Sequence, residues 1–492
     1  MRPNLSKQIF LDAVKCPAAG WARRHDKLED DDVDFYTRQA REVERLARSV
    51  FPDGRLIEAM NIQRAAQETA QLIDTADIGT LFDVHTLFEP TFVVHPYVTK
   101  ADILRRGSTG WHLYEVKMCT QMEKREEKEY IDDMAYTAMV IQAWGLTVSS
   151  VSLMILDKNY RPGMAYDRLF RTLDYSENAL PRSEEFLQEW NRIDEVTSAD
   201  EIPETDLELE CRRCPYFKQF IWPEYAHHIF ELPNLRQKRF QPLKERGIER
   251  IEDIPPDIEL TDPQQRVRDC IQSGQPLVES ELTDELDRIE WPAFYLDFET
   301  VGTALPLFSD VGPFEAVPFQ YSIHVCTAPG KVQEHREFLA EPGEDQRRQL
   351  AESLLDDLED AGSILVYYAA FEEGRIRELA EAFPDLADPL LALIDRIVDL
   401  LEIIKKNVCH PDFHGSNSIK KTLPALVPNM SYENLEIGEG GDAMAQYAGL
   451  VWDDHDADEA ATILDNLRAY CKQDTEAMVR LHEQLVGLVS RS

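Results

Sequence analysis

The segment from Ala293 to Thr300 constrains this chain more than any other. Its sequence, Ala-Phe-Tyr-Leu-Asp-Phe-Glu-Thr, predicts a short apolar strand that carries two acids. Because side chains alternate along a strand, Asp297 and Glu299 project from the same face. Two carboxylates held together in apolar surroundings repel each other, so they require a compensating cation. The segment therefore predicts a strand that faces a cation.

Three side chains that are distant in the sequence can complete such a site. Tyr470 and Asp474 are four residues apart, which places them on one face of a helix. Glu372 follows an expected strand at residues 364–368 and can reach the same place. Such a set suits two divalent ions about 4 Å apart, which activate water and stabilise the leaving oxygen in phosphodiester hydrolysis. We expect Mg²⁺ or Mn²⁺ there, with Tyr470 orienting the attacking water.

The order of these motifs resembles the DEDD exonucleases of the ribonuclease H-like fold, in the subgroup whose last motif is Tyr-x-x-x-Asp. The resemblance implies a 3′–5′ exonuclease domain. It also implies four metal ligands, which are Asp297, Glu299, Glu372 and Asp474. The family usually has Asp in its middle motif, where this sequence has Glu372, and Asp399 is the alternative fourth ligand.

Further segments of this region are similar to an uncharacterised DEDD-type family that is often joined to a RecB-like nuclease module. They are Gly415 to Lys420, Leu423-Pro424 and Ala443 to Tyr447.

A second acidic pattern lies near the N-terminus. Asp102 begins one expected strand, and Glu115 and Lys117 share a face of the next one, after a glycine turn. An Asp and a Glu can hold magnesium, while a Lys neutralises charge that develops on the phosphate or positions water. The order resembles the PD-(D/E)xK nucleases, which implies that all three residues are catalytic. Glu89 resembles the upstream acid of that family and is a further expected metal ligand.

Three cysteines extend this resemblance to the RecB-like, CRISPR-associated exonucleases that carry an iron–sulfur cluster. Cys16 follows a Leu-Ser pair, and Cys211 and Cys214 form a Cys-x-x-Cys, as in that family. Phe220 stands where a fourth cysteine is expected, and three thiolates fall short of the usual Cys₄ cage. Three interpretations stay open: zinc, a metal-free site, or a cluster completed by one of His227, His228 and Cys119. A second departure is that Thr137 to Ile141 replaces the family's Gln-x-x-x-Tyr motif.

The charge balance bears on the partner. The chain has 52 Lys and Arg against 92 Asp and Glu, a formal net charge of −40, which argues against duplex binding through neutralised phosphates. Part of the acidic excess, however, lies in residues 181–210, which contain eleven acids and two bases, whereas residues 234–250 are basic. Leu243 to Pro255 resembles a helix-hairpin-helix fragment. Expected nucleic-acid contacts are Arg236, Lys238, Arg239 and Lys420, with His414 in the same Gly/Ser loop as Lys420.

A length of 492 residues predicts two or three domains. We expect an α/β chain with a PD-(D/E)xK restriction-endonuclease-like domain at 1–233, a basic helical connector at 234–288 and a ribonuclease H-like DEDD domain at 289–492. No stretch approaches the roughly 20 apolar residues of a membrane span, and the N-terminus lacks a leader pattern, which favours a soluble, cytoplasmic protein.

The expected activity is metal-dependent hydrolysis of DNA from its ends, and the motifs do not distinguish DNA from RNA. The resemblances imply DNA processing or defence against mobile elements in a prokaryotic cytoplasm, with protein partners in a defence or repair complex. Two alternatives remain. Either the N-terminal domain is the active nuclease and the C-terminal one a processivity clamp, or both are degenerate and the chain is a nucleic-acid-binding scaffold.

Overall fold

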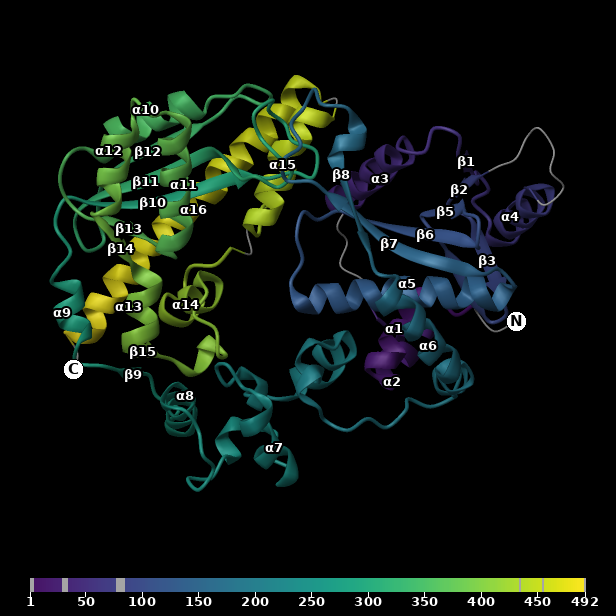
Figure 1. The fold of residues 1–492 in the computed structure, drawn as a ribbon. Coiled ribbons are helices and arrows are strands. Elements are labelled where there is room, and N and C mark those ends of the chain that lie inside the picture. The colour runs from purple at the N-terminus through teal and green to yellow at the C-terminus, as the bar shows by residue number, and fades with distance from the viewer. Residues whose placement is uncertain (1–3, 29–33, 77–84, 433–434, 454, 491–492) are drawn as a thin grey trace. The chain divides into compact units, whose positions relative to one another are not determined.

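The computed structural model describes residues 4–28, 34–76, 85–432, 435–453 and 455–490 (Figure 1). The chain folds into two compact units, each of which contains both helices and strands. The first unit comprises Met1–Glu224 and Thr303–Glu315, and the second comprises Tyr225–Gly302 and Ala316–Ser492. The segment 234–288, expected as a separate connector, is therefore counted within the second unit.

A six-stranded sheet forms the centre of the first unit, in the order β1-β2-β5-β6-β7-β8. Its strands are β1 (Arg55–Leu56), β2 (Thr86–Phe88), β5 (Ile103–Arg106), β6 (Trp111–Lys117), β7 (Val148–Leu156) and β8 (Phe170–Asp174). Strands β6 and β7 are parallel. Parallel neighbours need a crossover connection, and α5 (Lys124–Trp144) provides it.

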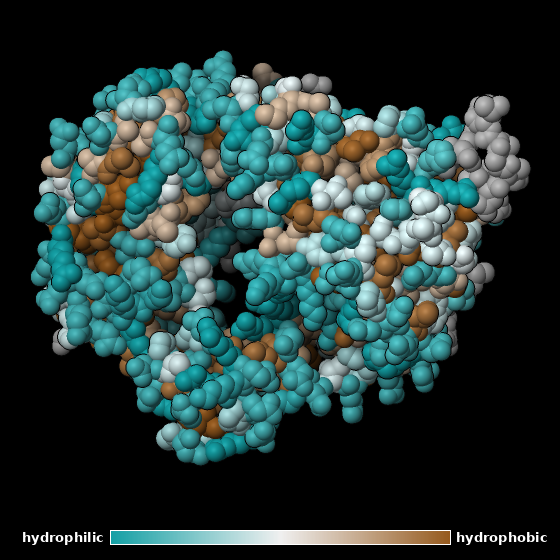
Figure 2. Space-filling view, in the orientation of Figure 1, coloured by the Kyte–Doolittle hydropathy of each residue, from teal (hydrophilic) through white to brown (hydrophobic). Residues whose placement is uncertain are grey.

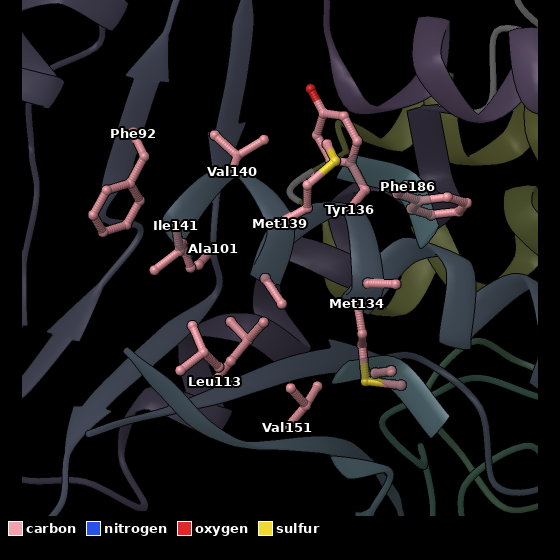
Figure 3. Close-up of a cluster of buried hydrophobic side chains, with 14 of the residues drawn as sticks. Phe92, Ala101, Leu113, Met134, Tyr136, Met139, Val140, Ile141, Val151 and Phe186 are labelled. Carbon is pink, nitrogen blue, oxygen red and sulfur yellow. The ribbon is translucent and has the colours of Figure 1, made fainter. Parts of the chain in front are cut away.

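Helix α5 has the local signals of a stable helix and supplies much of the first unit's core. It begins with a capping box between Glu123 and Glu126 and ends at Gly145, whose φ of 116° favours glycine. Figure 3 shows its buried side chains, such as Met134 and Ile141, among those of the neighbouring strands. The other elements are α1 (Lys7–Lys15), α2 (Pro17–Arg24), α3 (Asp34–Arg48), α4 (Ile62–Ala76), α6 (Ser176–Thr197), the hairpin β3 (Thr91–Val94) and β4 (Tyr97–Lys100), and short turns η1 (Tyr166–Leu169), η2 (Leu209–Arg213), η3 (Phe217–Ile221) and η4 (Trp222–Glu224).

The second unit contains a five-stranded sheet in the order β12-β11-β10-β13-β14. Its strands are β10 (Ala293–Val301), β11 (Val317–Ala328), β12 (Lys331–Leu339), β13 (Ile364–Val366) and β14 (Ile397–Asp399). The central strand β10 is antiparallel to β11 and parallel to β13. Both faces of β10 are covered, because its even-numbered apolar residues join one buried cluster and its odd-numbered ones join another.

Helix α16 (Ala457–Val489) packs against β10 and β11 and shares its apolar cluster with the odd-numbered residues of β10. This register places Asp297 and Glu299 on the face of the sheet that α16 covers. The remaining elements are η5 (Ile229–Glu231), α7 (Gln237–Glu245), η6 (Ile251–Asp253), α8 (Asp262–Ser273), β9 (Leu277–Val278), α9 (Leu282–Leu286), α10 (Arg347–Leu358), α11 (Ala369–Ala382), α12 (Ala387–Ile394), α13 (Leu400–Asn407), β15 (Val408–Cys409), η7 (Pro411–Phe413), α14 (Ile419–Leu426) and α15 (Gly440–Trp452).

The visible surface is mostly polar. Hydrophilic residues cover most of the face drawn in Figure 2, and apolar residues form smaller separate patches. Across the described ranges, no helix combines the length and the apolar character that a membrane span requires.

Candidate metal centres

Four carboxylates from three elements meet in the second unit. Strand β10 supplies Asp297 and Glu299, the first turn of α11 supplies Glu372, and α16 supplies Asp474. Asp297 and Glu299 each interact electrostatically with Asp474. Glu372 interacts electrostatically with Asp297 and Glu299. We call these four residues the acidic cluster. The structure therefore brings the four predicted carboxylates within electrostatic range of one another, and the ligand atoms within 4.8 Å of one another are those of Asp297, Glu299 and Cys471.

Burial dominates the electrostatics of the acidic cluster. It raises the pKa of Asp297, Glu299 and Glu372 well above their ordinary values, and the neighbouring carboxylates raise these pKa values further. Burial also raises the pKa of Asp474 to about 6, although hydrogen bonds from two tyrosines, Tyr432 and Tyr470, oppose that shift. The cluster is thus under electrostatic strain whenever its members are ionised together.

No lysine, arginine or histidine of the described residues lies within ion-pair distance of any member of the acidic cluster. The nearest charges are Arg375, which lowers the pKa of Glu372, and Lys420, which lowers that of Asp474. The Oε2 atom of Glu372 is buried and has no hydrogen-bond partner in the described part of the chain. Buried anions without partners are costly, and oxygen ligands suit Mg²⁺ or Mn²⁺, so the residues present fit divalent metal ions.

Asp399, the alternative fourth ligand, is occupied with backbone groups. Its Oδ1 accepts hydrogen bonds from the N–H groups of Leu401 at 2.9 Å and Tyr368 at 3.2 Å, and its Oδ2 accepts one from Ala369 at 2.9 Å. It therefore caps α13 and fastens the residues at which α11 begins. Because Glu372 lies in the first turn of α11, Asp399 helps to position that carboxylate.

Sequence reasoning missed two neighbours of the acidic cluster. The hydroxyl of Tyr432 donates to Oδ1 of Asp474 at 2.5 Å, and the thiol of Cys471 lies 3.8 Å from Oδ2 of Asp297. Cys471 could have been inferred, since it follows Tyr470 on the same helix. Tyr432 lies 42 residues before Asp474 in a connecting segment, and no local pattern points to it.

The acidic pattern of the first unit forms a different kind of cluster, in which the carboxylates contact lysines. Glu115 Oε1 lies 3.0 Å from Lys7 Nζ and 3.1 Å from Lys117 Nζ. Asp133, from α5, pairs with the same two lysines, and its Oδ1 lies 2.5 Å from Lys7 Nζ. Asp102 lies close by and accepts a hydrogen bond from the Val116 N–H at 2.7 Å. We call Lys7, Asp102, Glu115, Lys117 and Asp133 the mixed cluster.

The lysines change the titration of the mixed cluster. Burial, together with the charges of Asp102 and Asp133, raises the pKa of Glu115 to about 7, while Lys7 and Lys117 oppose that rise. Burial alone would also raise the pKa of Asp133, but the two lysines hold it well below its usual value. Oε2 of Glu115 is buried without a hydrogen-bond partner in the described ranges, so one ligand position remains open.

Lys7 and Asp133 were not predicted. Asp133 had a sequence signal, because it is an acid on an otherwise largely buried stretch of α5. Lys7 had none, because it lies 108 residues from Glu115. The predicted ligand Glu89 lies next to Asp102, since its backbone N–H donates to the Asp102 carbonyl at 3.0 Å, and its carboxylate pairs with Arg48 at 3.1 Å and with Lys100 at 2.5 Å.

The three predicted cysteines converge in the first unit. The Cys214 thiol hydrogen-bonds to the sulfur of Cys16, which lowers the pKa of Cys16 to about 7, and Cys211 is close enough to interact with Cys16. Within the described residues, these thiols do not form a set of three ligand atoms all within 4.8 Å of one another.

The alternative ligands for the cysteines have other neighbours. Phe220 packs against Tyr216 with ring centroids 5.2 Å apart, and Cys119 hydrogen-bonds to Tyr130. His227 contacts Glu231 within the second unit, and burial lowers the pKa of His228 to about 4.

The expected nucleic-acid contacts lie at the surface of the second unit. Arg236 and Lys238 are exposed at the start of α7, whereas Arg239 is half-buried and lies 3.8 Å from Glu259. Lys420, at the start of α14, pairs with Glu439 at 3.3 Å and also faces Asp474. Of these residues, Lys420 is the one that the structure connects to the acidic cluster.

The geometry defines a mixed α/β protein with two buried clusters of carboxylates, and comparisons with known proteins add a family match. Residues 294–418 match a family described as a domain of unknown function, DUF2779. That segment includes Asp297, Glu299 and Glu372 and ends before Tyr470 and Asp474.

The similar proteins are themselves uncharacterised. The chain is 23% identical over 218 residues to the uncharacterised protein MG366 of Mycoplasma genitalium. The aligned region covers 40% of this chain and 32% of that protein. It is 24% identical over 205 residues to the homologous protein of Mycoplasma pneumoniae, with 38% and 31% covered. The matched part thus spans about a third of the length of these relatives.

Proposed function

We propose that the chain is a metal-dependent nuclease that hydrolyses DNA from its ends, with the acidic cluster as its 3′–5′ exonuclease site. One observation carries the proposal: four carboxylates converge from β10, α11 and α16, three of them buried and Asp297 half-buried, and no cation of the described residues pairs with them. Bound Mg²⁺ or Mn²⁺ would supply Lewis acidity and lower the pKa of water at this site. Asp297, Glu299, Glu372 and Asp474 would hold the ions.

The tyrosines beside Asp474 supply hydrogen bonds within the site. Tyr470 is 5% exposed and interacts with Asp474 and Glu299, so its hydroxyl lies among the carboxylates. Burial raises the pKa of Tyr470 far above its ordinary value, which keeps the phenol protonated and able to donate. Tyr470 would orient the attacking water, and Tyr432 would hold Asp474 in place.

The distribution of charge favours binding to the ends of DNA strands over binding along a duplex. Lys420 faces Asp474 at one side of the site, and Arg236 and Lys238 provide an exposed basic segment on the same unit. The net charge of −40 over the whole chain weakens non-specific attraction to DNA. These features support a nuclease that captures ends with the help of metal ions. A role in DNA processing or in defence against mobile elements is proposed from the family resemblances alone.

The test is cleavage of single-stranded DNA and RNA oligonucleotides labelled at either end, in Mg²⁺ or Mn²⁺. The variants are Asp297→Asn and Asp474→Asn, with Asp465→Asn as the matched control, since Asp465 is an exposed acid on the same helix as Asp474. We expect both cluster variants to lose at least about 100-fold in rate, the scale on which a single electrostatic group acts on a transition state. The control should cleave like the unmodified chain.

Metal-dependent cleavage that survives Asp297→Asn would contradict the proposal. The position of the label that is released first reports polarity, and 5′–3′ removal would contradict the assigned direction. Absence of cleavage by the unmodified chain, with metal bound, would favour the scaffold alternative.

A second candidate site is the mixed cluster, and the buried, unpartnered Oε2 of Glu115 beside Lys117 favours it. Here Asp102 and Glu115 would hold the metal, and Lys117 would position water or neutralise developing charge. Lys117→Ala in the same assay distinguishes the two sites. Loss of cleavage in Lys117→Ala, with cleavage retained in Asp297→Asn, assigns the activity to the first unit.

A further inference from the structure

A third group of potential metal ligands lies in the second unit and belongs to neither acidic site. His227, Glu231 and His414 each offer a ligand atom, and these atoms all lie within 4.8 Å of one another. Nδ1 of His227 is 3.2 Å from Oε2 of Glu231, and Nδ1 of His414 is 3.4 Å from Oε1 of the same carboxylate. The two histidines come from segments nearly 200 residues apart, so tertiary packing alone assembles the group.

The backbone holds these three residues in place. Glu231 ends η5, and the N–H of Ile251 donates to the carbonyl of His227 at 3.0 Å. His414 has a φ of 48°, and Gly415, with a φ of 71°, follows it. A Cβ at Gly415 would lie 2.0 Å from the carbonyl oxygen of Glu231, so the two segments touch at a point where only glycine fits.

The charges within the group call for a cation. The Glu231 side chain is only 4% exposed, and within the described residues its ion-pair partners are the two imidazoles. Neutral imidazoles do not neutralise a carboxylate. Both Nδ1 atoms lie at hydrogen-bond distance from the carboxylate, and the two rings stack with their centroids 5.2 Å apart, so all three side chains converge on one point. A single bound cation would satisfy the carboxylate and both nitrogens.

We propose that His227, Glu231 and His414 form a binding site for Zn²⁺ or a similar transition-metal ion. Imidazole and carboxylate are characteristic ligands of zinc, whereas Mg²⁺ prefers oxygen ligands alone. Bonds of about 2.0–2.2 Å in a tetrahedral zinc site place neighbouring ligand atoms roughly 3.3–3.6 Å apart. The separations of 3.2 and 3.4 Å run from His227 to Oε2 and from His414 to Oε1 of Glu231, so each ring faces one oxygen of the carboxylate, and one atom from each of the three residues lies within 4.8 Å of the others. Water or an external ligand takes the fourth position.

The zinc site would clip one loop to another close to the acidic cluster. His414 lies in the loop before α14, and Lys420 near the start of α14 faces Asp474. The ion therefore would fix the loop that presents Lys420, and its role is structural. This inference does not depend on nuclease activity, because metal binding can be measured directly.

The experiment is equilibrium dialysis of the full chain, stripped with a chelator, against Zn²⁺, followed by elemental analysis. The variants are His414→Ala and Glu231→Gln. The matched control is His410→Ala, since His410 lies on the same loop and its ring accepts a hydrogen bond from the Asp412 N–H. We expect the unmodified chain and His410→Ala each to bind one more Zn²⁺ per chain than His414→Ala or Glu231→Gln. Affinity at this site should fall about 100-fold or more, since even outer-shell partners are worth 10- to 100-fold.

Cobalt substitution separates this site from the cysteines. The difference spectrum between the unmodified chain and His414→Ala should show visible tetrahedral Co²⁺ bands without thiolate charge-transfer absorption. Thermal unfolding of the metal-free proteins tests whether the variants fold, and Zn²⁺ should raise the midpoint less in Glu231→Gln than in His410→Ala. Equal zinc stoichiometry and affinity in the unmodified chain, His414→Ala and Glu231→Gln would overturn the proposal.

Discussion

The two units solve the same electrostatic problem in opposite ways. In the mixed cluster, Glu115 and Asp133 each contact Lys7 and Lys117, so much of the buried negative charge is balanced by the chain itself. In the acidic cluster, three buried carboxylates and the half-buried Asp297 have no cation in ion-pair contact among the described residues.

This difference indicates how much each unit gains from binding a metal ion. A cluster with its own cations folds without a metal but binds added metal less readily, because the lysines already compete for the carboxylates. A cluster without cations carries an unfavourable charge in the metal-free state and gains more when a metal ion binds. Four experiments can sharpen or break this comparison.

The largest expected effect concerns the lysines of the mixed cluster. Lys117→Met leaves Glu115 and Asp133 with one cation instead of two, and breaking a buried pair in this way costs about 3–5 kcal/mol. We expect the first unit to lose about 3 kcal/mol of unfolding free energy at neutral pH, measured by calorimetry. Lys15→Met is the control, because Lys15 and Glu129 form an exposed pair at 3.5 Å, worth at most about 1 kcal/mol. Equal losses in the two variants would show that the mixed cluster is not balanced by its lysines.

The next effect is stabilisation of the second unit by metal. Mn²⁺ at 100 times its dissociation constant should raise the unfolding free energy by about 2.7 kcal/mol. In a unit of this size that corresponds to a rise in melting temperature of roughly 5–10 °C. Asp297→Asn should abolish most of the rise, and Asp465→Asn should retain it. If Mn²⁺ raised the melting temperature of the first unit alone, the mixed cluster and not the acidic cluster would be the one that gains most from metal.

A pH series tests the cost of the metal-free acidic cluster. Burial raises the pKa of Asp297, so the folded state binds more protons than the unfolded state above about pH 4, and ionisation destabilises the fold as pH rises. Asp297→Asn should therefore stabilise the metal-free second unit at neutral pH by about 1–3 kcal/mol, the cost of desolvating a polar group that lacks a partner. The gain should vanish towards pH 4.

The unfolding free energy of Asp297→Asn must be compared with that of the unmodified chain at each pH, because buried histidines make the fold more stable as pH rises, whereas Asp297 makes it less stable. Burial lowers the pKa of His324 and His482 to about 4, so both stabilise the fold above about pH 6.5 and lose that contribution in acid. These residues are present in both proteins, and their effect cancels in the difference. A stabilisation by Asp297→Asn that does not change with pH would rule out charge as its cause.

The smallest expected effect concerns Tyr432, which hydrogen-bonds to Asp474 at 2.5 Å. In Tyr432→Phe the pKa of Asp474 should rise above its present value of about 6, since that hydrogen bond lowers it. Metal affinity should fall about tenfold, as for other residues that orient a ligand. Mn²⁺ titration measures it, with Tyr447→Phe as the control, because Tyr447 contacts the Glu341 carbonyl. Unchanged affinity in Tyr432→Phe would remove Tyr432 from the site.

Much of the acidic cluster could be predicted from the sequence, because its members follow local periodicities. Asp297 and Glu299 share a face of β10, and Tyr470 and Asp474 share a face of α16, as strand and helix geometry require. The nuclease assignment stays a prediction, as do the metals at either cluster and at the cysteines.

The roles of single polar residues in the tertiary fold were harder to predict. Asp399 was an alternative metal ligand, yet its oxygens accept backbone hydrogen bonds at the starts of α11 and α13. Glu89 was an expected metal ligand, and the structure pairs its carboxylate with Arg48 and Lys100, which no sequence pattern indicated. A side chain that can reach several partners is placed by packing, which a linear pattern does not contain.

The sequence by itself determined which carboxylates share a face, because strand and helix periods act over a few residues. Only the tertiary structure decided which charges those carboxylates meet. Lys7 reaches Glu115 across 108 residues of chain, Tyr432 reaches Asp474 across 42, and His414 reaches Glu231 across 183. Charge interactions depend on distance in space and on burial, and both are set when the elements pack together.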